Sequence, residues 1–271
     1  MHRLFVFLMT VIFSWCLLAA ACTEDKAKTA GYVTNTIIME PVPEEADSAH
    51  VDFRDLNHYT EGNLFCVASI VDNQSLLWQR VWVRLELFDA ADKPLTIDGD
   101  SSMVFRLACN AIPPKGASAF FISLPFSRIS GTPAYCRLSG AAAIEQEPGA
   151  ILIALDVGGV RALRPDPTDS TKTVDVGYQA QATIDNPLAV VAQRPRILFL
   201  LYGKDKKLYF VQMLDPQDPA SGMHLEPVGA IGPQSRANMV CPVSYQALPQ
   251  TLRDVHIERI DIQAYDARDG K

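Results

Sequence analysis

Apolar and polar residues alternate along several segments of the chain with the period of a β-strand. From Val81 to Leu87 every second residue is aliphatic, which is typical of a strand with one buried face. The segment from Ile197 to Tyr202 is apolar on both faces, as expected of a central strand. Between Ile257 and Ile262 isoleucines stand among polar residues and predict a final strand, with an irregularity near Glu258-Arg259. Helical spacing is found only between Ser244 and Val255, so the pattern predicts an all-β protein.

The second half of the chain repeats the pattern of the first. Three pairs of segments correspond in the same order: 65–73 with 178–186, 80–89 with 194–203, and 112–116 with 231–235. The first pair shares an ending of an aliphatic residue followed by Asp-Asn, and the second pair shares a long strand that leads into a turn. Three matches in one order indicate a tandem duplication, and the period is too long for a solenoid.

Short strands separated by Pro- and Gly-containing turns are typical of antiparallel β-sandwiches. Each repeat also resembles the FxLYD and related immunoglobulin-like domains of bacterial lipoproteins. Leu87-Phe88-Asp89 and Leu201-Tyr202-Gly203 stand where that family has its Leu-Tyr-Asp. The resemblance covers most of residues 60–140 and 175–265, and it implies two tandem immunoglobulin-like antiparallel β-sandwich domains rather than an activity.

The pattern divides the chain into a signal peptide, a tether and two domains. The expected ranges are 1–21 for the signal peptide, 22–49 for the lipidated cysteine and tether, 50–148 for the first sandwich, 149–174 for a linker, and 175–271 for the second sandwich. Residues 164–171 have linker composition. A strand between Tyr32 and Met39 stays open as an alternative, and it would shorten the tether. The apolar run from Ile151 to Val157 is either the last strand of the first domain or a strand passed to the second.

The N-terminus has the three parts of a secretory signal. Arg3 supplies a positive charge, residues 4–18 are mostly apolar, and Ala19-Ala20-Ala21 is a small-residue cleavage site. Leu18 to Cys22 resembles a bacterial lipobox. That resemblance implies a diacylglycerol on the Cys22 thiol and palmitate-type acyl chains that hold the protein in a membrane. Ala19 departs from the leucine that is commonest at this lipobox position.

Other fates of the N-terminus stay open. Ordinary cleavage after Ala21 would leave Cys22 as a plain first residue, and an uncleaved segment would be a short membrane anchor. Thr23 follows the cysteine, where enteric lipoproteins kept in the inner membrane carry aspartate. By resemblance, Thr23 favours the outer membrane, with the protein facing the periplasm.

Charge and cysteine content limit the partners and the cross-links. The formal net charge is −7 and no Lys/Arg cluster is present, so nucleic acid is excluded as a partner. Cys66, Cys109, Cys136 and Cys241 follow Cys22, and the oxidising periplasm permits disulfides. The immunoglobulin-like resemblance implies a possible Cys66–Cys136 bridge, although the repeat alignment points Cys66 outward. Pairing of Cys109 with Cys66 or Cys136 stays open.

No known catalytic motif occurs in the sequence, and we expect no enzyme and no cofactor. Two polar clusters have metal-like composition: His50, Asp52, Asp55 and His58; and Asp89, Asp92, Asp98 and Asp100. The first cluster has a spacing that could ligate zinc, but no repeat partner or cysteine supports it, so a polar segment at the domain entry explains it better. The second cluster lacks the calcium-loop spacing with its terminal glutamate, so a solvated hairpin turn explains it better. Trp78 and Trp82 are expected to be packing residues rather than a binding face.

Two functions fit these observations. The first is a non-catalytic outer-membrane lipoprotein that acts as an adaptor or assembly factor in an envelope protein complex. The alternative is a periplasmic ligand-binding module, with a glycan or small-molecule site between the two domains.

The lipobox resemblance predicts the mass and the location of the mature protein. From the native host we expect a chain that begins at Cys22, carries acyl mass and fractionates with membranes, because two or more acyl chains anchor stably. Cys22→Ala should leave the membrane fraction. Intact mass spectrometry and fractionation measure both outcomes, and a soluble wild-type chain that begins at an unmodified Cys22 would contradict the prediction.

Overall fold

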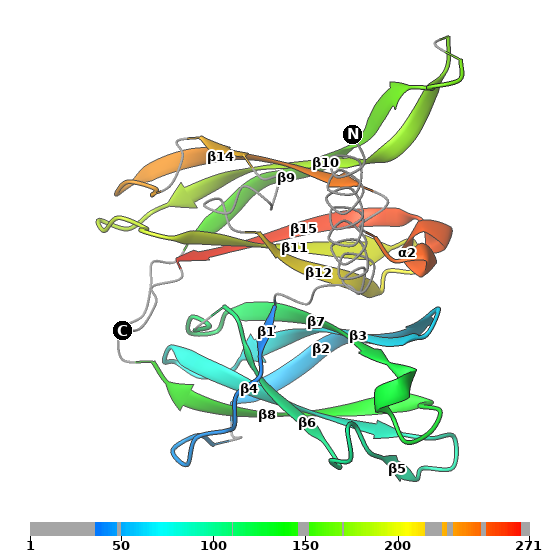
Figure 1. Ribbon diagram of the computed structural model, residues 1–271. Helices are drawn as coiled ribbons and strands as arrows, with labels where there is room; N and C mark the ends of the chain where they lie inside the picture. Colours follow the sequence, from blue (N-terminus) through cyan, green and yellow to red (C-terminus); the bar gives the residue numbers. More distant parts are fainter. Residues whose placement is uncertain are drawn as a thin grey trace, which may run out of the picture. The chain divides into compact units, whose positions relative to one another are not determined.

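The computed structural model describes residues 36–47, 50–109, 111–145, 152–169, 171–214, 224–226, 230–244 and 248–266. All of these belong to one compact unit that begins at Thr34 (Figure 1). The predicted signal peptide 1–21 and Cys22 lie outside the described residues. The described chain is almost entirely antiparallel β-sheet, which confirms the predicted all-β, sandwich-like fold.

The first half of the unit forms two sheets. Its elements are β1 (Ile37–Ile38), β2 (Val51–Glu61), β3 (Leu64–Asn73), β4 (Gln79–Phe88), β5 (Pro94–Leu95), β6 (Met103–Leu107), β7 (Ala117–Pro125), the 3-10 helix η1 (Phe126–Arg128) and β8 (Tyr135–Ile144). One sheet has the order β2-β3-β7. In the other sheet β4 lies between β6 and β8, with β1 outside β6 and β5 beside the end of β4.

The second half forms two further sheets. Its elements are β9 (Ile153–Pro165), β10 (Thr173–Asn186), β11 (Pro195–Gly203), β12 (Leu208–Leu214), β13 (His224–Glu226), β14 (Ser235–Ser244), α2 (Gln250–Val255) and β15 (Ile257–Asp266). The sheet orders are β13-β14-β10-β9 and β12-β11-β15. Helix α2 falls inside the single window with helical spacing. The register of β15 against β11 shifts next to Glu258, which confirms the predicted irregularity.

The two halves have the same topology. In each half the second long strand lies between the first and the fifth (β3 between β2 and β7; β10 between β9 and β14). The third long strand lies between the fourth and the last (β4 between β6 and β8; β11 between β12 and β15). This shared order is the structural counterpart of the sequence repeat.

The first strand of each half carries a β-bulge at the same place. Asp55 (φ 54°) and Asp156 (φ 52°) both adopt the left-handed conformation, and two residues there oppose a single residue of the neighbouring strand. The opposed residues are Ser69 and Ala182. A short Asp side chain tolerates this conformation better than a bulky one, and such bulges re-aim the side chains that follow.

A buried asparagine closes the second long strand of each half. Asn73 Nδ2 donates to the carbonyl oxygens of Leu77, Ile112 and Pro113 at 2.8–3.0 Å, and its Oδ1 accepts from a backbone amide two residues later. Beside the isolated β-bridge between Gln79 and Ile112, the side chain joins the loop after β3 to the loop before β7. Because it is 1% exposed, water cannot replace these bonds.

Asn186 repeats this arrangement in the second half. Its Nδ2 donates to the carbonyl oxygens of Val190, Ile231 and Gly232 at 2.8–3.2 Å, and Asn186 is fully buried. We call Asn73 and Asn186 the clamp asparagines. The Asp-Asn ending that the two repeats share in sequence therefore marks equivalent positions in the structure, where each asparagine makes the same set of hydrogen bonds.

The four sheets form successive layers, and the two inner sheets meet each other (Figure 1). Strand β12 contacts β2, β3 and β7 of the first half. Covered on both sides, β3 is buried from Phe65 to Val71, and β11 is buried from Ile197 to Gly203. A strand with both faces covered is apolar throughout, which accounts for the continuous apolar run in β11.

Hydrogen bonds join the inner sheets across this interface. Just beyond the first bulge, Asn57 donates from Nδ2 to the Leu208 carbonyl at 3.0 Å. Tyr59 Oη donates to the Tyr209 carbonyl at 2.8 Å, and the two tyrosine rings lie 5.1 Å apart. These bonds satisfy carbonyls of an edge strand that the interface removes from solvent.

A carboxylate from the first half caps the helix of the second. Glu61 accepts from the backbone amides of Gln250 (2.6 Å) and Thr251 (2.9 Å), at the N-terminus of α2. The helix has no side-chain cap of its own. A negative charge at a helix N-terminus is stabilising by about 0.3–1 kcal/mol at a surface. Elsewhere in the interface, the rings of Phe121 and Phe210 meet at 5.1 Å.

The interval 149–174, expected to be a linker, contains a strand pair. Strand β9 pairs with β10 along most of its length, and a turn stabilised by Asp166 and Asp169 connects them. The apolar run from Ile151 to Val157 therefore belongs, where described, to the second half. Aspartate, threonine and proline have the composition of a linker, but they equally form a tight hairpin turn.

The tether is shorter than the expected range 22–49. Strand β1 pairs with β6, and Thr36 Oγ1 exchanges two hydrogen bonds with the backbone of Phe121. Asp47 exchanges two backbone hydrogen bonds with Ala142 of β8. Strand β1 lies within the stretch 32–39, where the sequence leaves a strand open, whereas the polar composition around Asp47 gives no sign of its pairing with Ala142.

The proposed Cys66–Cys136 disulfide is absent, and both residues are buried thiols. Cys66 shares a face of its sheet with Phe121, which packs on Phe210 of the second half. Cys136 lies opposite Leu87 in the core of the first half. The two side chains lie on opposite faces of the β2-β3-β7 sheet, so they cannot bridge. The repeat alignment was right that Cys66 points out of its own sandwich.

We expect the clamp asparagines to contribute more to the free energy of unfolding than an exposed asparagine does. Asn73→Ala removes three side-chain hydrogen bonds and leaves the Leu77 carbonyl oxygen without a donor among the described residues, because the carbonyls of Ile112 and Pro113 keep backbone donors. Asn186→Ala removes the equivalent three bonds in the second half. We expect each variant to lower the free energy of unfolding by about 1–3 kcal/mol. Chemical denaturation measures the change, with the exposed Asn238→Ala as a control; equal effects at Asn73 and Asn238 would disprove the role.

Candidate functional site

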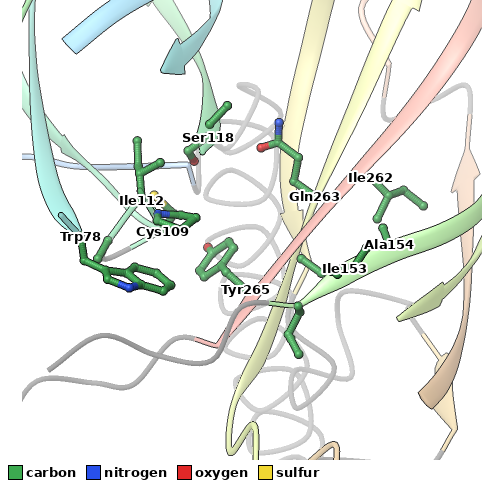
Figure 2. A pocket seen from close by; sticks show the side chains of 14 residues that line it. Trp78, Cys109, Ile112, Ser118, Ile153, Ala154, Ile262, Gln263 and Tyr265 are labelled. Atoms are coloured by element: carbon green, nitrogen blue, oxygen red, sulfur yellow. The ribbon is translucent and has the colours of Figure 1, made fainter. Parts of the chain in front are cut away.

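The best-formed cavity opens at the junction of the two halves and has a volume of about 300 Å³. We call it the junction pocket (Figure 2). Its lining comes from both halves: Trp78, Cys109, Ala111, Ile112, Pro113, Ala117, Ser118, Leu152, Ile153, Ala154, Ile262, Gln263, Ala264 and Tyr265. Most of these side chains are apolar, and none is charged.

The clamp asparagine Asn73 holds the first wall of the pocket. Its bonds to Leu77, Ile112 and Pro113 fix the segment before Trp78 and the segment before β7. Trp78 is further held by its carbonyl, which accepts from the amide of the residue after β8. Hydrogen bonds from the Asn73 side chain and from the backbone therefore position this wall.

The ends of β15 and β9 form the second wall. Tyr265 and Gln263 point toward the first half in Figure 2, and Ile153 and Ala154 close the opposite side. The Tyr265 hydroxyl lies 2.9 Å from the Met213 sulfur, and burial raises the Tyr265 pKa well above its ordinary value. Tyr265 therefore remains a neutral phenol and adds no charge to the pocket.

Two polar atoms of the lining have no hydrogen-bond partner among the described residues. They are the hydroxyl oxygen of Ser118, whose residue is 3% exposed, and the amide Oε1 of Gln263. The polar group next to the Ser118 hydroxyl is the Cys109 thiol. Sulfur is a weak hydrogen-bonding group, so the thiol does not replace a full hydrogen-bond partner. An unpartnered buried polar atom costs about 1–3 kcal/mol, so both atoms favour a bound partner.

Burial keeps the cysteines of the described chain protonated. It raises the pKa of Cys109 to about 11, against a smaller opposing effect of the Ser118 hydroxyl. Burial likewise raises the pKa of Cys66 and Cys136 to about 12 and that of Cys241 to about 11. A thiol nucleophile needs a lowered pKa, so the pocket thiol is not suited to covalent catalysis.

Exposed aliphatic side chains occur on the loops and strand ends at the same end of the molecule as the pocket. We define the apolar rim as Leu76, Leu77, Ile144, Ile153, Leu188 and Val190, which are 37–77% exposed. Leu77 precedes the pocket residue Trp78, and Ile144 pairs with the residue that follows Trp78. The loops after β3 and after β10 lie on the same side of the view in Figure 1. Exposed apolar patches of this kind commonly mark binding surfaces.

The metal-like clusters are dispersed in the structure. The first cluster is spread along β2 and the turn before it, where Asp55 pairs with Arg54 and the His58 ring stacks on Phe65. Burial, with a smaller effect of Lys207, lowers the His58 pKa. Within the described ranges, no group of three or more His, Cys, Asp or Glu side chains could hold a metal ion.

The acidic cluster of the second candidate site serves turns instead. Asp89 accepts from two backbone amides of its own turn, Asp92 accepts from the Tyr135 hydroxyl, and Asp98 pairs with Arg128. Trp82 is a buried packing residue, as expected. Trp78 is a pocket residue, which the sequence did not favour.

The sequence missed Cys109, Ser118, Gln263 and Tyr265 as candidate site residues. They lie far apart along the chain, and only the packing of the two halves brings them together. No local motif could have indicated them.

No known protein-family model matches the chain, and the comparison with curated proteins finds no match either. Within the described residues, no helix has the length and apolarity needed to cross a membrane. The fold and the junction pocket are therefore the observations from which a function can be argued.

Thiol accessibility tests both the buried cysteines and the state of Cys22. At pH 8 a thiol with a pKa of about 11 is about 0.1% thiolate, so we expect Cys66, Cys109, Cys136 and Cys241 to be unreactive in the native protein. In denaturant these four should react with a thiol reagent. A fifth reactive thiol would mean that Cys22 carries no thioether-linked lipid, and fast native labelling would disprove the buried arrangement.

Proposed function

We propose that the mature protein is a non-catalytic lipoprotein of the outer membrane, facing the periplasm and acting as an adaptor or assembly factor in an envelope protein complex. The observation that carries the proposal is the apolar rim: six exposed aliphatic side chains on loops and strand ends, one of which (Ile153) also lines the pocket. A protein partner would remove this surface from water, at about 25 cal/mol for each Å² of apolar area buried.

The architecture supports a scaffold-like role. The two halves share a continuous interface and form one compact unit, so they would present the rim as a single surface. The pocket lining has no histidine, carboxylate or amine for acid–base chemistry, which supports a binding role over catalysis. The membrane contact is proposed to be the lipid on Cys22.

The alternative is ligand binding between the two halves, and one specific observation favours it. The junction pocket has aromatic walls from Trp78 and Tyr265 and two unpartnered polar atoms. Small-molecule sites typically combine an apolar lining with a few placed polar groups, and they often lie between domains. Both functions would use the same end of the molecule.

Photo-crosslinking in the native host tests the adaptor proposal. A photoreactive amino acid at Leu77 or Val190 should yield discrete protein adducts, because both side chains belong to the rim. The same residue at Lys93, an exposed position at the opposite end of β4, is the control and should yield none. Adducts at all three positions alike, or at none, would count against a partner on the rim.

A further inference from the structure

The junction pocket has the chemical character of a site for an uncharged molecule. Its fourteen lining residues include no acidic or basic side chain. Burying an ion without a partner of opposite charge is very costly, so a charged ligand group is disfavoured. The lining therefore selects against anions, cations and zwitterions.

The size and polarity of the pocket also argue against a sugar or water alone as its occupant. A volume of about 300 Å³ equals that of about ten water molecules. Each buried water needs two to four polar partners, and a sugar presents several hydroxyl groups. The described lining offers the two unpartnered atoms of Ser118 and Gln263, which is too few for either occupant.

The two unpartnered atoms define what a ligand should carry. Gln263 Oε1 is a carbonyl-type oxygen, so it requires a donor from the ligand. The Ser118 hydroxyl rotates and can either donate or accept. In Figure 2 both side chains reach into the space between Trp78 and the β9 strand. A single O–H or N–H group attached to an apolar body matches this arrangement.

We propose that the junction pocket binds a neutral, mainly apolar small molecule whose hydroxyl or N–H group donates to Gln263 Oε1. The apolar body of the ligand lies between the rings of Trp78 and Tyr265 and the aliphatic side chain of Ile153. The inference rests on the ligand-binding alternative above, and it specifies the class of ligand.

A matched pair of probes tests the inference by the fluorescence of Trp78. Cyclohexanol has a donor, whereas cyclohexyl methyl ether has the same ring and oxygen but no donor. The protein is the full mature chain with Cys22→Ala, which needs no detergent, and with Trp82→Phe, which leaves Trp78 as its single tryptophan. The indole nitrogen of Trp82 makes no hydrogen bond to the described residues, so Trp82→Phe removes none.

We expect saturable binding of cyclohexanol, tighter than that of the ether by roughly three- to tenfold, the effect of one hydrogen bond. Gln263→Leu should remove the difference between the probes, whereas the exposed Gln181→Leu should preserve it. Ala154→Phe should fill the cavity and abolish both titrations, with circular dichroism to verify folding.

The possible failures are distinguishable. If neither probe binds saturably, both the ligand-binding function and the inferred ligand class are wrong. If both probes bind equally well, or if the difference survives Gln263→Leu, the pocket binds ligands but the donor to Gln263 is refuted.

Discussion

The packing of the β2-β3-β7 sheet on the β12-β11-β15 sheet is the constraint on which the rest of the structure depends. Both sheets lie between two other layers, so their central strands, β3 and β11, are buried on both faces. Polar groups survive in this interface only with a partner, as the bonds of Asn57 and Tyr59 to edge-strand carbonyls show. The Glu61 carboxylate extends the interface to α2, which has no side-chain cap of its own.

The duplicated halves keep the same local devices but use them in different surroundings. The bulge at Asp55 directs the following strand into the interface, where Asn57 meets Leu208. The equivalent bulge at Asp156 lies in an outer sheet, near the contact between Gly159 and Ile260. A bulge bends its own strand, and this effect does not depend on what packs against that strand. Each half therefore keeps the bulge although the side chains around it differ.

The sequence could predict the features that depend on residues near one another in the chain, but not those that depend on contacts between distant segments. The two-residue alternation in β4, the irregularity near Glu258 and the short helix α2 are local features, and the structure confirms them. Residues 149–174, expected to be a linker, contain strand β9 and the start of its partner β10. Pro and Asp are common in both linkers and hairpin turns, so composition does not distinguish the two. The disulfide was proposed from resemblance to another fold. It failed because Cys66 faces the second half instead of its own core.

The junction pocket and part of the apolar rim lie beside the two loops that the clamp asparagines hold. Each clamp asparagine holds a loop at the same end of its half, and each loop carries apolar side chains. In the first half, the segments held by Asn73 meet β15 and β9 of the second half, and the imperfect fit between them leaves the junction pocket. The loop held by Asn186 leaves Leu188 and Val190 exposed to solvent. One loop therefore contributes a cavity wall and the other a surface patch, which is why a ligand in the pocket would lie directly beside a partner on the rim.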